Sequence, residues 1–451
     1  MDEVVMNTMA NIVSKPQLSE QLNLDAFWMP FTGNRAFKAA PRLVAGAEGA
    51  YFTDVDGRRL FDSLSGLWCT GLGHKHPKII EAIHQQLHTL DYAPGFQTGH
   101  LLAFELAEKL ASMAPADLSR VFFTNSGSEC ADTALKMARA YWRAKGKPEK
   151  TRLIGRAKGY HGVNMGGTSV GGMGPNRKHY GQLLDADHLP HTLLKENAFS
   201  RGQPEQGAEL ADTLLQLIEL NDASNIAAVI VEPMSGSAGV IVPPVGYLQR
   251  LRTLCDEHDI LLIFDEVITG FGRMGEMFGA DFFGVVPDIM NLAKQLTNGV
   301  VPMGAVIAKE HIYQAFMEQP GPDYMVEFAH GYTYSGHPVA CAAAMASLNV
   351  LTEEDIPARV KQLMPTFEEQ IHRLRGLPHV VDIRNCGLAG AVQLAPYPGE
   401  PARRPMELAI QLWQAGYYVR FGGDTLQFGP PFISTPDELE QLFNAVAGVL
   451  I

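Results

Sequence analysis

The sequence contains only five cysteines in 451 residues, and none of them belongs to a Cys-x-x-Cys pair. An odd number of scattered cysteines indicates neither a disulfide framework nor a cysteine-based zinc site. We therefore expect no bound metal and a reducing, cytoplasmic environment. The first residues contain no basic stretch followed by an apolar core, so we also expect no signal peptide.

Positive charge is scarce as well. The 36 lysines and arginines are outnumbered by 49 aspartates and glutamates, which gives a formal net charge of -13. The basic residues form no stripe of the kind that nucleic-acid binding requires. The longest segment without Asp, Glu, Lys or Arg, residues 328–352, is rich in Gly, Ser, His and Ala, which is typical of a buried helix and its approach loop. We expect small-molecule substrates, with no nucleic acid and no membrane as partner.

Two nucleotide-binding motifs are also missing. No G-x-G-x-x-G follows a predicted strand, and no G-x-x-x-x-G-K-[ST] occurs anywhere, which disfavours nicotinamide and P-loop nucleotide sites. The length exceeds what one hydrophobic core usually supports, and 46% apolar with 19% charged residues is ordinary for a globular protein. The sequence therefore predicts an α/β protein of two domains.

Two predicted strands end in charged residues. The apolar run 261–264 leads directly into Asp265, and the apolar run 289–293 leads into Lys294. Continuous apolar runs are typical of buried parallel strands, and open α/β sheets bind ligands at the carboxyl ends of their strands. Lys294 has no evident structural partner in the local sequence. The two side chains are candidates for one site.

This pair matches the needs of a pyridoxal phosphate enzyme. A lysine amine forms a Schiff base with the cofactor aldehyde, and a carboxylate keeps the pyridine nitrogen protonated so that the ring withdraws electrons. The alternative is that neither residue has a catalytic role, because carboxylates at strand ends are common caps and isolated lysines are usually at the surface. Phosphate-binding and ring-stacking elements elsewhere in the sequence would favour the catalytic interpretation.

Such elements do occur. Residues 126–128, Ser-Gly-Ser, begin a predicted helix, where free N–H groups, hydroxyls and the helix dipole favour an anion. Serine is also a common helix cap. Tyr160 lies in a loop after a short strand and is a candidate to stack on a pyridine ring. Glu232 ends the buried strand 226–231. Trp68 lies in a glycine-rich loop, as a packed turn residue or a pocket wall.

The remaining pattern predicts a small β-rich lobe at the N-terminus and an α+β C-terminal lobe that matches it. Asp56-Gly57 between two short apolar stretches predicts a hairpin. Near the C-terminus, strands are expected around residues 380–383, 390–394, 417–420 and 425–428. Residues 304–308 are expected to form an antiparallel or edge strand.

Over essentially its whole length the chain resembles the class III aminotransferases of fold type I. The most specific segments are FDEVITGFGRMG at 264–275 and NLAKQLTNG at 291–299. The resemblance implies a large domain with a mostly parallel mixed sheet and a small α+β domain built from both termini. The implied ranges are 1–70 for the first part of the small domain, 71–335 for the large domain and 336–451 for the rest.

The resemblance also implies roles for individual residues. Pyridoxal 5'-phosphate would be the cofactor, and a homodimer with shared active sites, with a tetramer as a further option, would be the active unit. The implied roles are Lys294 as Schiff-base lysine, Asp265 as partner of the pyridine nitrogen, Tyr160 and Val267 on the two ring faces, Ser126, Gly127 and Ser128 as phosphate cup, Glu232 near the ring, Thr333 at the partner's phosphate, and Trp68 and Arg420 at the substrate.

Within the class, three segments most resemble the ω-amino acid:pyruvate (β-alanine:pyruvate) aminotransferases. These segments are residues 24–42, 65–74 and 417–432. The implied reaction moves the amino group of an ω-amino acid or primary amine to pyruvate, in a ping-pong cycle through pyridoxamine phosphate. Four alternatives stay open: a taurine or other amine transaminase, an aminomutase, a non-catalytic cofactor-binding protein and a nicotinamide dehydrogenase.

Overall fold

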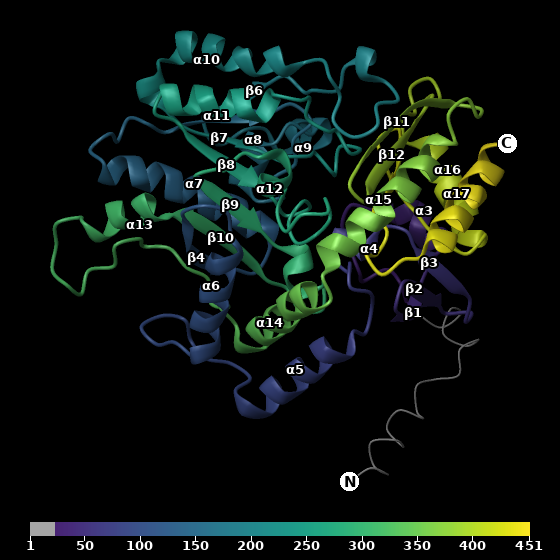
Figure 1. The fold of residues 1–451 in the computed structure, drawn as a ribbon, viewed down its shortest axis with the longest axis horizontal. Coiled ribbons are helices and arrows are strands. Elements are labelled where there is room, and N and C mark those ends of the chain that lie inside the picture. The colour runs from purple at the N-terminus through teal and green to yellow at the C-terminus, as the bar shows by residue number, and fades with distance from the viewer. Residues whose placement is uncertain (1–22) are drawn as a thin grey trace.

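The computed structural model describes residues 23–451, and this part of the chain forms three β-sheets. The largest sheet has seven strands and occupies the middle of the molecule (Figure 1). In spatial order its strands are β4 (Leu118–Thr124), β10 (Gly304–Lys309), β9 (Ile289–Leu292), β8 (Leu261–Asp265), β7 (Ile226–Val231), β5 (Arg152–Arg156) and β6 (Ala186–Leu189).

The large sheet is mixed but mostly parallel. Strands β6, β5, β7, β8 and β9 run parallel to one another, whereas β10 pairs antiparallel with both β9 and β4. The prediction that residues 304–308 form an antiparallel strand is confirmed. Its alternative, an edge strand, is wrong, because β10 is hydrogen-bonded on both sides and the edges are β4 and β6.

Helices cover both faces of the large sheet, which explains its uninterrupted apolar strands. All residues of β7 and β8 are buried. Helices α7 and α13 pack on one face, and α11 and α14 pack on the other. The longer helices are α5 (Pro77–Thr89), α6 (Leu101–Met113), α7 (Gly127–Ala144), α10 (Thr213–Asn221), α11 (Tyr247–Glu257), α13 (Glu310–Met317), α14 (Pro338–Glu353), α15 (Ile356–His372), α16 (Arg403–Gln414) and α17 (Pro436–Leu450).

Several short helices connect these elements. They are α3 (Asn34–Ala39), α4 (Ser65–Trp68), α8 (Met165–Val170), α9 (Gly174–Tyr180), α12 (Gly279–Phe283) and the 3-10 helices η2 (Lys195–Asn197), η3 (Ala208–Asp212), η4 (Ala223–Asn225) and η5 (Lys294–Thr297). Within residues 23–451 no helix combines the length and the apolar character that crossing a bilayer requires.

The two smaller sheets bring the ends of the chain together. One has the order β1 (Val44–Glu48), β2 (Tyr51–Asp54), β3 (Arg59–Asp62), β13 (Tyr417–Tyr418), and the other has the order β11 (Val380–Cys386), β12 (Ala389–Leu394), β15 (Thr425–Phe428), β14 (Arg420–Gly422). Strands β2 and β3 form the hairpin predicted at Asp56-Gly57. Strand β13 pairs in parallel with β3, so the purple N-terminal strands lie beside the yellow C-terminal helices in Figure 1.

The strand predicted at residues 417–420 is divided between the two smaller sheets. Residues 417 and 418 pair with β3, whereas residues 420–422 pair with β15. Val419, between them, is buried with 5% of its surface exposed. Local sequence shows an extended segment there, and β14 forms a local hairpin with β15. The division depends on β3, which pairs with residues 417 and 418 and is distant in the chain. This division places Arg420 at the start of β14.

Candidate active site

A cavity of about 340 Å³ lies where the carboxyl ends of β7, β8 and β9 meet the N-terminus of α7. This is the position at which open α/β sheets bind their ligands. The predicted site residues that line it are Ser126, Gly127, Ser128, Tyr160, Glu232, Asp265, Val267 and Lys294. Among residues 23–451, no cluster of three or more His, Cys, Asp or Glu side chains could hold a metal ion.

Lys294 follows β9 and begins η5 in a left-handed conformation, with φ of 46°. A left-handed residue other than glycine is uncommon and often marks a functional position. Burial lowers the pKa of the Lys294 amine, and the charges of Asp265, Cys69 and Glu232 oppose this effect. A lysine with a lowered pKa has a larger neutral fraction, which is the form that acts as nucleophile or base.

Asp265 is the last residue of β8 and is held by two donors. Its Oδ2 lies 2.9 Å from His161 Nδ1, and its Oδ1 accepts from the Val267 backbone N–H at 3.3 Å. Both side chains are buried, with 5% of Asp265 and 1% of His161 exposed. His161 Nε2 has no partner in the described part of the chain, so the tautomer with the proton on Nδ1 satisfies the pair. His161 therefore orients the Asp265 carboxylate.

The adjacent carboxylate, Glu266, faces away from the cavity. It accepts hydrogen bonds from Thr269 Oγ1 at 2.7 Å, Gly279 N at 2.6 Å and Ala280 N at 2.7 Å. Burial raises the pKa of Glu266 to about 7, although these donors oppose the shift. Glu266 closes the loop between β8 and α12. Of the two neighbouring acids, only Asp265 lines the cavity.

The start of α7 has the features of a phosphate site. Ser126 Oγ caps the helix by accepting from Glu129 N at 3.2 Å, and Glu129 Oε2 accepts in return from Asn125 N at 2.7 Å. The backbone N–H groups of Gly127 and Ser128 have no acceptor in the described part of the chain. Because both residues line the cavity at the positive end of an 18-residue helix, they fit an anion.

Two glycines near the start of α7, Gly127 and Gly162, lie where a larger side chain would not fit. A Cβ on Gly127 would lie 3.0 Å from both methyl groups of Val267. A Cβ on Gly162, at φ of 90°, would lie 2.4 Å from Ser128 Oγ. Ser128 Oγ also accepts from Val163 N at 3.1 Å. These glycines let the start of α7 lie close to both Val267 and the loop after Tyr160.

Tyr160 and Glu232 also line the cavity. Tyr160 N donates to Glu232 Oε1 at 3.0 Å, and Glu232 has 4% of its surface exposed. Burial raises the pKa of the Glu232 carboxyl, and His161 opposes the rise. Phe31 meets the Tyr160 ring edge-on, with centroids 6.4 Å apart. Phe31 has 74% of its surface exposed.

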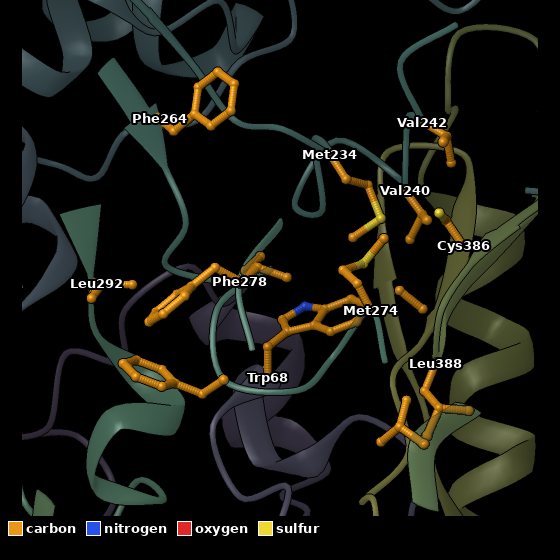
Figure 2. Close-up of a cluster of buried hydrophobic side chains, with 14 of the residues drawn as sticks. Trp68, Met234, Val240, Val242, Phe264, Met274, Phe278, Leu292, Cys386 and Leu388 are labelled. Atoms are coloured by element: carbon orange, nitrogen blue, oxygen red, sulfur yellow. The ribbon is translucent and has the colours of Figure 1, made fainter. Parts of the chain in front are cut away.

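Trp68 does not line the cavity. It has 2% of its surface exposed and belongs to the buried cluster with Met274 and Phe278 shown in Figure 2. Its left-handed φ of 67° follows a kink at Leu67, which places Leu67 at the cavity and the indole in the core. The sequence offered no signal for Leu67. The indole supports the cavity wall from behind.

Arg420 and Thr333 also lie outside the lining of this cavity. The charge of Arg420 opposes the burial-driven rise in the pKa of Tyr160, so the guanidinium acts on the site electrostatically. Asp424, four residues after Arg420, accepts from Gln393 Nε2 at 2.8 Å, and no ion pair joins it to Arg420 in the described part of the chain. Thr333 is exposed, and its carbonyl accepts from the Tyr92 hydroxyl at 3.1 Å.

A lysine and a carboxylate at neighbouring strand ends, beside an anion-binding helix start, define the fold type I class of pyridoxal phosphate-dependent enzymes. Comparison of the sequence with known protein families shows which family within this class the chain matches. Residues 32–450 match the aminotransferase class-III family. The chain belongs to this family.

Two curated relatives cover nearly the whole chain. A beta-alanine–pyruvate aminotransferase of Pseudomonas aeruginosa is 62% identical over 446 residues, which is 99% of each chain. An omega-amino acid–pyruvate aminotransferase of Pseudomonas putida is 61% identical over 435 residues, covering 96% of this chain and 97% of the relative. Identity this high over full length means that this chain and the relatives share their domain content.

Solved structures agree with the fold. An omega transaminase from Pseudomonas jessenii in complex with PMP has a TM-score of 0.89 at 34% identity, covering 97% of this chain and 98% of that one. A PLP-bound amine transaminase from an uncultivated Pseudomonas species has a TM-score of 0.86 at 38% identity, covering 94% and 98%. The sequence-based assignment to fold type I and class III is confirmed.

Proposed function

We propose that the protein transfers the amino group of an ω-amino acid, β-alanine in particular, to pyruvate, giving L-alanine and an oxo product. The observation that carries this proposal is the Lys294 amine in a cavity with Asp265 and the anion-binding start of α7. The two relatives that are more than 60% identical, both named for pyruvate and for β-alanine or ω-amino acids, support the substrate assignment.

Pyridoxal 5'-phosphate supplies, when bound, an aldehyde that condenses with amines and a protonated ring that withdraws electrons. Lys294 would hold the cofactor through this aldehyde, and its free amine would move a proton at the amine-bearing carbon of the donor. Asp265, oriented by His161, would hold a proton on the ring nitrogen. Tyr160 and Val267 would hold the ring between them.

The remaining residues position the phosphate and the substrate. The N–H groups of Gly127 and Ser128, with the hydroxyls of Ser126 and Ser128, hold the phosphate. Arg420 binds the carboxylate that β-alanine and pyruvate share, since a planar guanidinium suits bidentate contact with a carboxylate. Glu232, buried beside Tyr160, fixes the Tyr160 loop under the ring.

We further propose a homodimer with shared sites. An aromatic surface on each subunit remains exposed next to the loop that carries Thr333, including Phe96 (57% exposed), Phe104 (70%) and Tyr334 (58%). Tyr92 joins this surface to the loop, with its ring 6.1 Å from that of Tyr334. A second copy of the chain would cover this surface and receive Thr333 at its phosphate. Sedimentation would separate the dimer from a tetramer of two such dimers.

The domain division at residues 70/71 and 335/336 and the cytoplasmic location also remain proposals. Pairing of β3 with β13 supports a small domain built from both ends. Helix α14 packs against α5, α6 and η5, so it joins this domain to the large sheet. All five cysteines are free thiols, which fits a reducing compartment.

A screen of amine donors against pyruvate, read as alanine formed, tests the function. We expect β-alanine to be a better donor than taurine or a simple aromatic amine. Rearrangement of one amino acid without consumption of pyruvate would indicate an aminomutase instead. A bound cofactor with no turnover on any donor would indicate a non-catalytic protein, and extraction of a nicotinamide in place of pyridoxal phosphate would contradict the proposal outright.

A further inference from the structure

Two amide side chains within four residues after Lys294 are buried without belonging to the cavity lining. Gln295 has 3% and Asn298 has 1% of its surface exposed. Asn298 ends η5 in a left-handed conformation, with φ of 50°, as Lys294 begins it with φ of 46°. Buried amides require partners for both their donor and acceptor atoms. Their partners lie more than two hundred residues away in the sequence.

Both amides bind the backbone of residues 71–73. Gln295 Oε1 accepts from Gly71 N at 2.6 Å, and Asn298 Oδ1 accepts from Leu72 N at 2.9 Å. Asn298 Nδ2 donates to the Gly73 carbonyl at 2.8 Å, and Gln295 Nε2 donates to Asn298 Oδ1 at 3.2 Å. We call these two side chains the amide clasp. It connects the lysine segment to a loop of the N-terminal region.

The amide clasp and its neighbours restrict movement of residues 71–73 relative to the segment that contains Gln295 and Asn298. A Cβ on Gly71 would lie 2.4 Å from a ring carbon of Phe432 and 2.6 Å from Gln295 Oε1. The Gly71 carbonyl accepts from Phe432 N at 2.7 Å, and Ser347 Oγ donates to the Gln295 carbonyl at 3.2 Å. A shift of residues 71–73 would therefore break several short buried bonds together.

The clasped loop carries part of the cavity wall. Leu67 and Cys69 line the cavity that Lys294 also lines. Asp62 also holds this loop: its Oδ2 accepts from Gly66 N at 2.6 Å and lies 2.9 Å from His74 Nε2. The wall is thus held by Asp62, which contacts residues on both sides of it, and by the amide clasp.

We propose that Gln295 and Asn298 are positioning residues that set the Lys294 amine relative to the Leu67–Cys69 wall. The inference rests on the proposed role of Lys294 and deepens it. The direction of the lysine side chain depends on its left-handed backbone, which is disfavoured in isolation and is stabilised by the clasp at the next residue. An amino-donor substrate that lies against the Leu67–Cys69 wall then meets the Lys294 amine at a fixed distance. The clasp accordingly determines the rate of proton transfer more than the affinity for the cofactor.

Asn298→Gly is the most discriminating variant. Glycine accepts the left-handed backbone at no cost and removes only the side chain. We expect kcat/KM for β-alanine and pyruvate to fall at least tenfold, while the Kd for pyridoxal phosphate stays within threefold, because the phosphate site is on α7. Asn298→Asp, which retains the acceptor for Leu72 N but loses the donor to Gly73, should fall between the parent and Asn298→Gly. Gln295→Met should resemble Asn298→Gly.

Two measurements on the cofactor-free protein do not depend on turnover. Hydrogen exchange at the Leu72 amide should become at least tenfold faster in Asn298→Gly. The rate of reductive methylation of Lys294 with formaldehyde and cyanoborohydride should change at least threefold, because the amine moves in its environment. If the parent shows no transamination, the proposed function fails, and the methylation rate still decides the positioning role.

Asn385→Ala is the matched control. Asn385 is a buried amide in β11 that bonds to His372 Nε2 at 2.9 Å and Glu368 Oε2 at 3.1 Å, away from the cavity. This variant should lower the unfolding temperature and leave Leu72 exchange, Lys294 methylation and kcat/KM unchanged. The inference is overturned if Asn298→Gly keeps the parental kcat/KM and methylation rate, whether or not Leu72 exchange accelerates.

Discussion

Replacing Asp265 by asparagine keeps the shape of the side chain and removes its charge. A carboxylate beside the ring nitrogen raises the pKa of that nitrogen, because an opposite charge favours the protonated form. Without it the ring withdraws electrons poorly. We expect the transamination rate to fall about a hundredfold or more, which corresponds to about 2.7 kcal/mol or more of added barrier.

The structure adds a second contribution through His161. If the asparagine amide nitrogen turns toward His161 Nδ1, the ring must move its proton to Nε2, which is buried and has no partner among the described residues. An unsatisfied buried donor costs about 1–3 kcal/mol. If the amide oxygen faces His161 instead, the amide nitrogen takes the other position. A hydrogen-bond donor then stands where the protonated pyridine nitrogen of the cofactor needs an acceptor. Neither orientation of asparagine reproduces what the carboxylate does.

Glu266→Gln is the matched control, since it neutralises the next residue in the chain. The Glu266 carboxylate accepts three hydrogen bonds, one from Thr269 in the β8–α12 loop and two from the first residues of α12. Glutamine leaves at least one of these buried donors without an acceptor. We expect a lower unfolding temperature. The rate per folded molecule should stay within about threefold of the parent, because Glu266 does not line the cavity.

The assay is single-turnover reaction of each purified variant with β-alanine, normalised to bound pyridoxal phosphate. A rate for Asp265→Asn within tenfold of the parent would show that another residue holds the ring nitrogen. Equal rate losses in Asp265→Asn and Glu266→Gln would mean that the loss reflects disruption of the β8 end and not the missing charge. Either result would refute the assignment of Asp265.

Four further predictions concern other parts of the protein. Lys294→Ala should abolish turnover yet still bind pyridoxal phosphate, as shown by cofactor retention on gel filtration; transamination within tenfold of the parent would contradict the catalytic role. Arg420→Ala should raise KM for pyruvate and β-alanine about 10- to 100-fold, since a charged hydrogen bond is worth about 1.5–3 kcal/mol. The single-turnover half-reaction with an aromatic amine that lacks a carboxylate should change far less. Equal losses for β-alanine and the aromatic amine would leave the carboxylate site unassigned. Subunit exchange between Thr333→Ala and Lys294→Ala proteins should give hybrids with one site that carries both lesions and one that carries neither, so a mixture no more active than its components would exclude shared sites. Burial raises the pKa of Glu266 to about 7, so its contribution to stability should be complete below about pH 4.5 and be lost as pH rises through about 7; urea unfolding between pH 5 and 8 should show this fall in the parent and a smaller fall in Glu266→Gln.

The sequence by itself determined much of the large sheet and the candidate site. The apolar runs that end at Asp265 and Lys294 are visible because strands buried on both faces need apolar residues at every position. The helix start at residues 126–128 is visible because a cap and an anion site use local backbone groups. Each of these signals lies within one element, so no knowledge of distant contacts was needed.

Only the tertiary structure decided which side chains meet. It assigned different roles to Asp265 and Glu266, because successive residues at a strand end point in opposite directions. It paired His161 with Asp265, directed Leu67 to the cavity and buried Trp68 in the core. It also divided residues 417–422 between two sheets and joined Asn298 to residues 72 and 73. The contacts of His161 with Asp265, of β13 with β3 and of Asn298 with residues 72 and 73 join segments separated by a hundred or more residues. Their approach is fixed by packing and hydrogen bonding and leaves no local pattern in the sequence.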